Sequence, residues 1–108
     1  MTDDRNRVTV ADWNTYFKSI IPPVGDMSKT PTFGYIVDEF RKLYGIYVSV
    51  TPSTKSELTN DDKIVYNYRE EVYKLNGNNV VIHWSGSNQA FYLAMREALR
   101  KASEFVDD

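Results

Sequence analysis

The C-terminal part of the chain contains the pattern that most restricts the fold. In SNQAFYLAMREALRKASEF (residues 87–105) the apolar residues recur at the spacing of one helix face. These residues are Phe91, Ala94, Met95, Ala98, Leu99, Ala102 and Phe105. The charged residues Arg96, Glu97, Arg100 and Lys101 fall on the other side, so the pattern predicts an amphipathic helix. Its three alanines are small enough for the helix to lie close on a sheet.

Three segments predict strands for that sheet. IYVSVTP (residues 46–52) alternates apolar and polar side chains and is stopped by a proline. Residues 63–75 fit either a helix or a long strand, but their Val and Tyr content, followed by NGNN and VVIHW, favours a hairpin with Asn-Gly at the turn. In the second hairpin strand we expect one face to carry Val80, Ile82 and Trp84, and the other Val81 and His83.

Two helices are predicted before the first strand. Thr9 is a suitable N-cap for a helix over residues 10–21, which Pro22 and Pro23 cannot continue. Thr30 is the expected N-cap of the second helix, with Pro31 at its first position and Gly45 just past its end.

The predicted order is therefore helix, helix, strand, strand, strand, helix. This order indicates an α+β fold, with a three-stranded antiparallel sheet packed with three helices. The chain of 108 residues is 42% hydrophobic and 26% charged, which is typical of one globular domain. Within this domain, 1–108, we expect residues 1–8 to be a flexible N-terminus and residues 53–62 to be a mobile loop.

The composition argues against several classes of chemistry. The absence of cysteine rules out disulfides and thiolate zinc sites, and a single histidine disfavours a metal centre. The sequence has no Gly-x-Ser-x-Gly elbow and no phosphate-binding glycine motif, so we expect no catalytic residue and no cofactor. Glu70 and Glu71 are neighbours on a predicted strand, where they would point to opposite faces, and solvated charge is the expected state of both.

Net charge and hydropathy bear on location and partners. No stretch reaches 18 consecutive apolar residues, so we expect no membrane association and a cytoplasmic location. The net charge of −2 provides no global basic field for nucleic acid.

Tyrosine is the residue type that most indicates a binding surface. The chain has eight, and several fall on predicted strands close to a charged residue or to the single histidine. If one sheet face is left open, these residues form an aromatic and charged surface suited to binding proteins. If helices cover both faces, the tyrosines lie at the rim of the core. The candidate residues are Tyr47, Tyr66, Tyr68, Arg69, Tyr73, His83 and Trp84.

A second candidate site follows the second hairpin strand. Ser85, Gly86, Ser87 and Asn88 precede the last predicted helix, where free N–H groups at a helix N-terminus can hold a phosphate or carboxylate. The simpler interpretation is a strand-to-helix turn with Ser87 or Asn88 as the N-cap.

Two families show a similar order of elements. The run from FGYIVDEFRKLYGIYVSV through the hairpin to NQAFYLAMREALRKA, about residues 30–105, resembles small phage and prophage proteins with an alpha-beta-alpha sandwich domain. That resemblance implies a phage or mobile-element origin. From residue 31 onward the order also looks like a double-stranded-RNA-binding domain, but SGSNQAFY stands where that family has a lysine-rich phosphate clamp.

The sequence therefore leads to three functional expectations. The first is a small non-enzymatic binding module, an accessory protein of a phage or mobile element that docks on a host protein and modulates it. The second is a small-ligand or nucleotide sponge that uses residues 85–88, in a homo-oligomer whose chains complete a pocket. The third is an RNA-binding module that uses Arg69, Lys74, Arg96, Arg100 and Lys101, although nucleic acid is the less expected partner.

Overall fold

The computed structural model describes residues 6–25, 28–53, 57–58, 64–65 and 67–107, and the order of its main elements is the predicted one. The helical elements are α1 (Val10–Asp12), the π-helical turn η2 (Trp13–Phe17), α2 (Phe33–Tyr44) and α3 (Phe91–Glu104). The strands are β1 (Ile46–Pro52), β2 (Glu57–Leu58), β3 (Ile64–Val65), β4 (Tyr68–Asn76) and β5 (Asn79–Asn88). The α+β class predicted from the sequence is confirmed.

The main sheet is antiparallel, with β4 in the middle between β1 and β5. The β4–β5 hairpin turns within the predicted NGNN segment, but Asn76 pairs with Asn79, so the two turn residues are Gly77 and Asn78 rather than Asn76 and Gly77. Gly77 has a φ of 63°. The register shifts between Lys74 and Leu75, which places Val80 opposite Leu75 rather than on the face of Ile82 and Trp84 as predicted.

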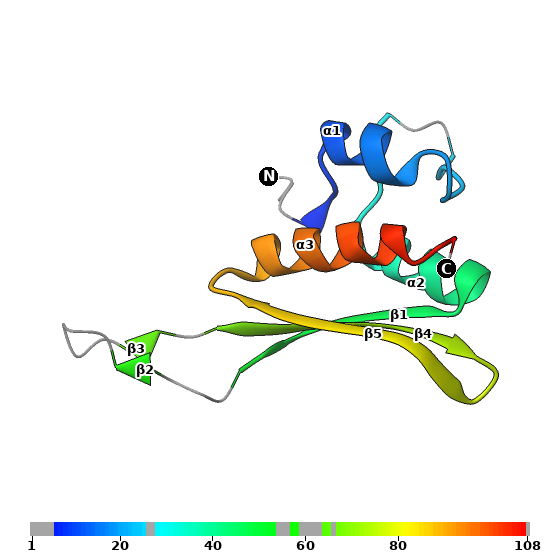
Figure 1. The fold of residues 1–108 in the computed structure, drawn as a ribbon. Coiled ribbons are helices and arrows are strands. Elements are labelled where there is room, and N and C mark those ends of the chain that lie inside the picture. Colours follow the sequence, from blue (N-terminus) through cyan, green and yellow to red (C-terminus); the bar gives the residue numbers. More distant parts are fainter. Residues whose placement is uncertain (1–5, 26–27, 54–56, 59–63, 66, 108) are drawn as a thin grey trace.

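All described helices lie on the same face of this sheet, as Figure 1 shows. Ile46 and Val72 on that face are fully buried, and Ala98 and Ala102 of α3 belong to the same buried cluster. The small side chains allow the close approach of helix and sheet that the sequence predicts. The alternative in which helices cover both faces is wrong.

The N-terminal elements form a further layer over α3 (Figure 1). Trp13 and Phe17 belong to the same core cluster as the sheet residues. Asp12 is also buried, and its carboxylate accepts from Arg96 at 3.1 Å and from Arg100 at 2.8 Å. These two contacts join the N-terminal layer to α3.

Both N-terminal helices differ from the prediction. Thr9 caps the first one as expected, but the helix predicted over residues 10–21 is a short α-helical segment followed by η2, which ends at Phe17. The second helix is capped by Thr32, not Thr30, and begins at Phe33. The backbone before Phe33 pairs with the N-terminal segment instead of turning into a helix, since the Val8 N–H donates to the Pro31 carbonyl at 3.1 Å and Thr32 forms a β-bridge with Arg7.

Part of the connection from β1 to β4 forms a short pair of strands. Glu57 and Leu58, inside the segment expected to be a loop (53–62), form β2 and pair with β3. The rest of that loop, apart from Ser53, lies outside the described residues, as do residues 1–5 of the predicted flexible N-terminus. The described part of the segment 63–75 is extended and not helical, as the composition favours. It is not one long strand, because β3 and β4 belong to different sheets and Asn67 lies outside both.

Candidate docking surface

The second face of the main sheet carries no helix among the described residues (Figure 1). Alternation along the strands places every second side chain there, and the strand register aligns these side chains in rows across the sheet. We call this surface the open face. Its central residues are Tyr47, Ser49, Thr51, Arg69, Glu71, Tyr73, His83, Ser85 and Ser87.

One row of the open face is aromatic. Tyr73 on the central strand lies between Tyr47 on β1 and His83 on β5. The Tyr47 and Tyr73 rings are stacked with centroids 6.4 Å apart, and the Tyr73 and His83 rings lie at 5.6 Å. Three rings from three strands thus form a continuous, partly solvent-exposed surface.

The other two central rows of the open face are polar and carry balanced charge. Arg69 donates to Glu71 on the same strand, with Nη2 to Oε1 at 2.8 Å. The flanking positions on β1 and β5 are serines and a threonine: Ser49, Thr51, Ser85 and Ser87. The face therefore has no net cationic field in its centre.

The structure brings together four of the seven predicted site residues: Tyr47, Arg69, Tyr73 and His83. Tyr68 and Trp84 lie on the helix-covered face instead. Tyr68 packs edge-to-face on Phe91 at 5.6 Å, and the Lys101 ammonium lies 5.5 Å from the Trp84 ring. Tyr66 lies outside the described residues.

The prediction that Ser85–Asn88 form a helix N-terminus is wrong. These residues extend β5, and α3 begins only at Phe91 with Ala90 as its N-cap and no side-chain cap. Ser85 and Ser87 therefore belong to the open face. Gly86 points to the helix-covered face, where the Trp84 ring leaves no room for a β-carbon.

Glu70 is a buried carboxyl group that the sequence analysis missed. Glu70 and Glu71 do point to opposite faces, but Glu70 is fully buried rather than solvated. Neither of its carboxyl oxygens has a hydrogen-bond partner within the described part of the chain. Burial, and then the neighbouring carboxyl group of Glu97, raise the pKa of Glu70 to about 8. The signal available in the sequence was its position: even-numbered residues of this strand, such as Val72, face the core.

The five cations considered for RNA binding are each engaged within the molecule. Arg96 and Arg100 hold Asp12, and Lys101 pairs with Glu104 at 3.0 Å. The two cations of β4 are also occupied, because Arg69 pairs with Glu71 while Lys74 donates to the carbonyl of Phe105 at 2.9 Å. A phosphate backbone would have to compete with these contacts.

The described residues also bear on metal binding and on membrane insertion. They contain no cluster of three or more histidine, aspartate or glutamate side chains placed to hold a metal ion. No helix within the described ranges has both the length and the apolarity required to cross a membrane.

No protein-family model matches the sequence, and comparison with curated proteins and with solved structures gave no match. Functional assignment therefore depends on the chemistry of the open face.

Proposed function

We propose that this protein is a non-enzymatic binding module that docks on a protein partner through its open face. The observation that supports the proposal is the one-sided fold: the described helices and the core lie on one sheet face, and an aromatic row remains exposed on the other. An exposed row of stacked rings in a small domain is typical of an interaction surface.

The residue types favour a protein partner. Tyrosine provides a large, rigid contact area, and serine and threonine provide adaptable hydrogen bonds, which is the composition of many protein-binding surfaces. The charge balance of Arg69 and Glu71 disfavours a polyanion. Bases could stack on the rings, but the centre of the face lacks the cationic groove that tracks a backbone.

Steric occupation of the partner's surface is the proposed mechanism. Tyr47 and Tyr73 would be the anchors, because they are the largest side chains of the aromatic row. Consistent with the resemblance to phage and prophage proteins, we place the protein in the bacterial cytoplasm, as an accessory factor that modulates a host protein.

The test compares variants in an affinity pull-down from nuclease-treated bacterial lysate. Wild type should retain a stoichiometric protein, and Tyr47→Ser with Tyr73→Ser should lose it. Leu43→Ser is the matched control, because Leu43 is also an exposed hydrophobic residue (50% exposed) but lies on α2. The control should retain the protein.

The captured protein should then be purified and its affinity measured directly. The proposal is supported if the double tyrosine variant raises the dissociation constant by at least about 30-fold, which corresponds to about 2 kcal/mol. Equal binding by wild type and the double variant, or a partner lost on nuclease treatment, would overturn it. The open face could instead bind a second copy of this chain. Light scattering detects that outcome, because it measures the mass of the purified protein in solution.

A further inference from the structure

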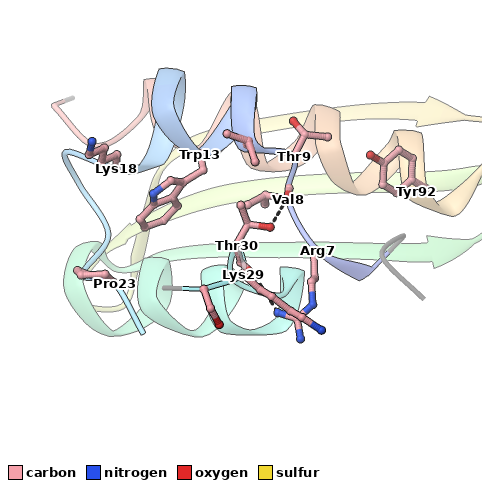
Figure 2. Close-up of a pocket in the computed structure, with 11 residues that line it drawn as sticks. Arg7, Val8, Thr9, Trp13, Lys18, Pro23, Lys29, Thr30 and Tyr92 are labelled. Carbon is pink, nitrogen blue, oxygen red and sulfur yellow. Dashed lines mark hydrogen bonds between the residues drawn. The ribbon is translucent and has the colours of Figure 1, made fainter. Parts of the chain in front are cut away.

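A cavity of about 910 Å³ lies away from the open face, in the N-terminal layer. It is lined by residues 7–10, Trp13, Lys18, Pro23, residues 28–30 and Tyr92 of α3. This volume is within the range of small-molecule sites, about 300 to 1,000 Å³. We call it the N-terminal pocket; Figure 2 shows its lining.

The backbone and hydroxyl groups that shape this pocket are largely satisfied by one another. The Thr30 hydroxyl donates to the Val8 carbonyl at 2.6 Å, and the Val8 N–H donates to the Pro31 carbonyl at 3.1 Å. The Thr9 hydroxyl accepts from the Asp12 N–H at 3.0 Å. A ligand therefore meets mainly apolar surface, in which Val10 and Pro23 are exposed while Val8 and Trp13 lie largely buried beneath it.

The charged groups of the pocket are all cationic. Arg7, Lys18 and Lys29 line it, and no carboxylate does so among the residues that the structure describes. Arg7 is held in position because its Nη1 donates to the Thr30 carbonyl at 2.8 Å, which leaves its other N–H groups for a second acceptor. Figure 2 places Arg7 and Lys29 together on one side of Trp13, with Lys18 and Pro23 on the other.

From this arrangement we infer that the N-terminal pocket binds a small amphipathic carboxylate. The anionic head lies between Arg7 and Lys29, and the apolar chain lies across Val8 and Trp13 toward Pro23. Two cations beside an apolar surface complement this chemistry and disfavour a neutral or cationic ligand. The inference goes beyond the proposed docking function, because the pocket lies in the helical layers and uses no residue of the open face.

Dodecanoate is a suitable probe, and Trp13 can report its binding. The chain has two tryptophans, so Trp84→Phe leaves Trp13 as the single fluorophore. In this variant, dodecanoate below its micelle concentration should change Trp13 emission saturably with one binding site, and acetate should not. Dodecanol, which has the same chain without the charge, should bind at least about tenfold more weakly, because a hydrogen bond to a charged group is worth about 1.5 to 3 kcal/mol.

A charge reversal locates the head group. Lys29→Glu in the Trp84→Phe background should weaken dodecanoate binding by at least about tenfold. Lys42→Glu, which makes the same charge change at an exposed position of α2, is the matched control and should bind as the parent does. Circular dichroism should show both variants to be folded.

Three results would overturn the inference: no saturable change with dodecanoate, equal affinity for dodecanol, or equal losses in Lys29→Glu and Lys42→Glu. A Tyr73→Ser variant with unchanged dodecanoate affinity would show that the pocket acts independently of the open face. Loss of dodecanoate binding in that variant would contradict the assigned location.

Discussion

Arg100 of α3 donates through Nη2 to Asp12 Oδ1 at 2.8 Å, across 88 positions of sequence. The Asp12 side chain is only 6% exposed, and Arg96 donates to its second oxygen. This carboxylate therefore connects the N-terminal layer to the helix that covers the sheet.

Replacing Asp12 by Asn should destabilise the protein by about 1 to 3 kcal/mol, because two cations lose a buried charged acceptor. Urea unfolding at pH 7 measures the change. Asp38→Asn is the control, since Asp38 forms an exposed pair with Arg41 at 3.9 Å, and it should cost less than about 0.5 kcal/mol. Equal costs would contradict the connecting role of Asp12.

The Asp12 effect should disappear in acid. Burial alone raises the pKa of Asp12, but the hydrogen bonds from Arg100 and Arg96 outweigh burial and hold it below its ordinary value of 3.8. A carboxylate with a lowered folded-state pKa stabilises the fold above its unfolded pKa and loses that contribution as pH falls through the folded pKa. The difference between wild type and Asp12→Asn should therefore shrink below about pH 4.

The raised pKa of Glu70 predicts that stability depends on pH in the direction opposite to that of Asp12. Its folded-state pKa, about 8, lies above its ordinary value of 4.5. The protonated form is thus favoured in the fold, and stability is lost as pH rises from the ordinary value through the folded one. Glu70→Gln should match wild type near pH 4 and exceed it progressively up to pH 8, by roughly a few kcal/mol, since one pKa unit corresponds to about 1.4 kcal/mol.

Chemical denaturation of Glu70→Gln and wild type between pH 4 and pH 9 tests this course. Glu71→Gln, one position along β4 on the open face, controls for the loss of a carboxylate. A constant difference between Glu70→Gln and wild type from pH 4.5 to pH 8 would argue against a neutral buried carboxyl group at this position.

Gly86 should tolerate no side chain while Trp84 keeps its position. A β-carbon there would lie 2.7 Å from Trp84 Cη2, so Gly86→Ala should displace the ring and cost about 1 to 3 kcal/mol. Thermal unfolding and tryptophan fluorescence report the two effects. Gly34→Ala is the control, because open space surrounds Gly34 on α2, and it should stabilise the protein by about 0.5 to 1 kcal/mol. An unchanged thermal stability in Gly86→Ala would show that the Trp84 ring is not fixed in this position.

The elements predicted correctly from the sequence are those that bury one face, because burial of one face imposes a regular spacing of apolar residues. The stripe of α3 and the alternation of β1 are examples, because helix period and strand period differ clearly in each. The NGNN segment identified the hairpin for the same local reason.

The features that could not be predicted from the sequence depend on contacts between residues far apart in the chain. Thr30 is a good helix cap in isolation, but the residues that follow it pair with the N-terminal segment and the helix starts later, at Phe33. Glu70 was expected to be solvated, yet it is fully buried, and the burial of Asp12 against Arg96 and Arg100 of α3 depends on contacts far apart in sequence. The candidate site was half predictable: the tyrosines could be chosen by residue type, but which of them share the open face depended on strand register and on all helices lying on one side.

Site-specific photocrosslinking at position 83 shows whether the open face binds a protein. A benzophenone amino acid replaces His83 in the aromatic row and, as the matched control, Lys42 on α2. We expect one discrete, nuclease-resistant protein adduct at position 83, absent at position 42 and abolished by Tyr73→Ser. No protein adduct at position 83, or the same adduct at both positions, would contradict docking through the open face.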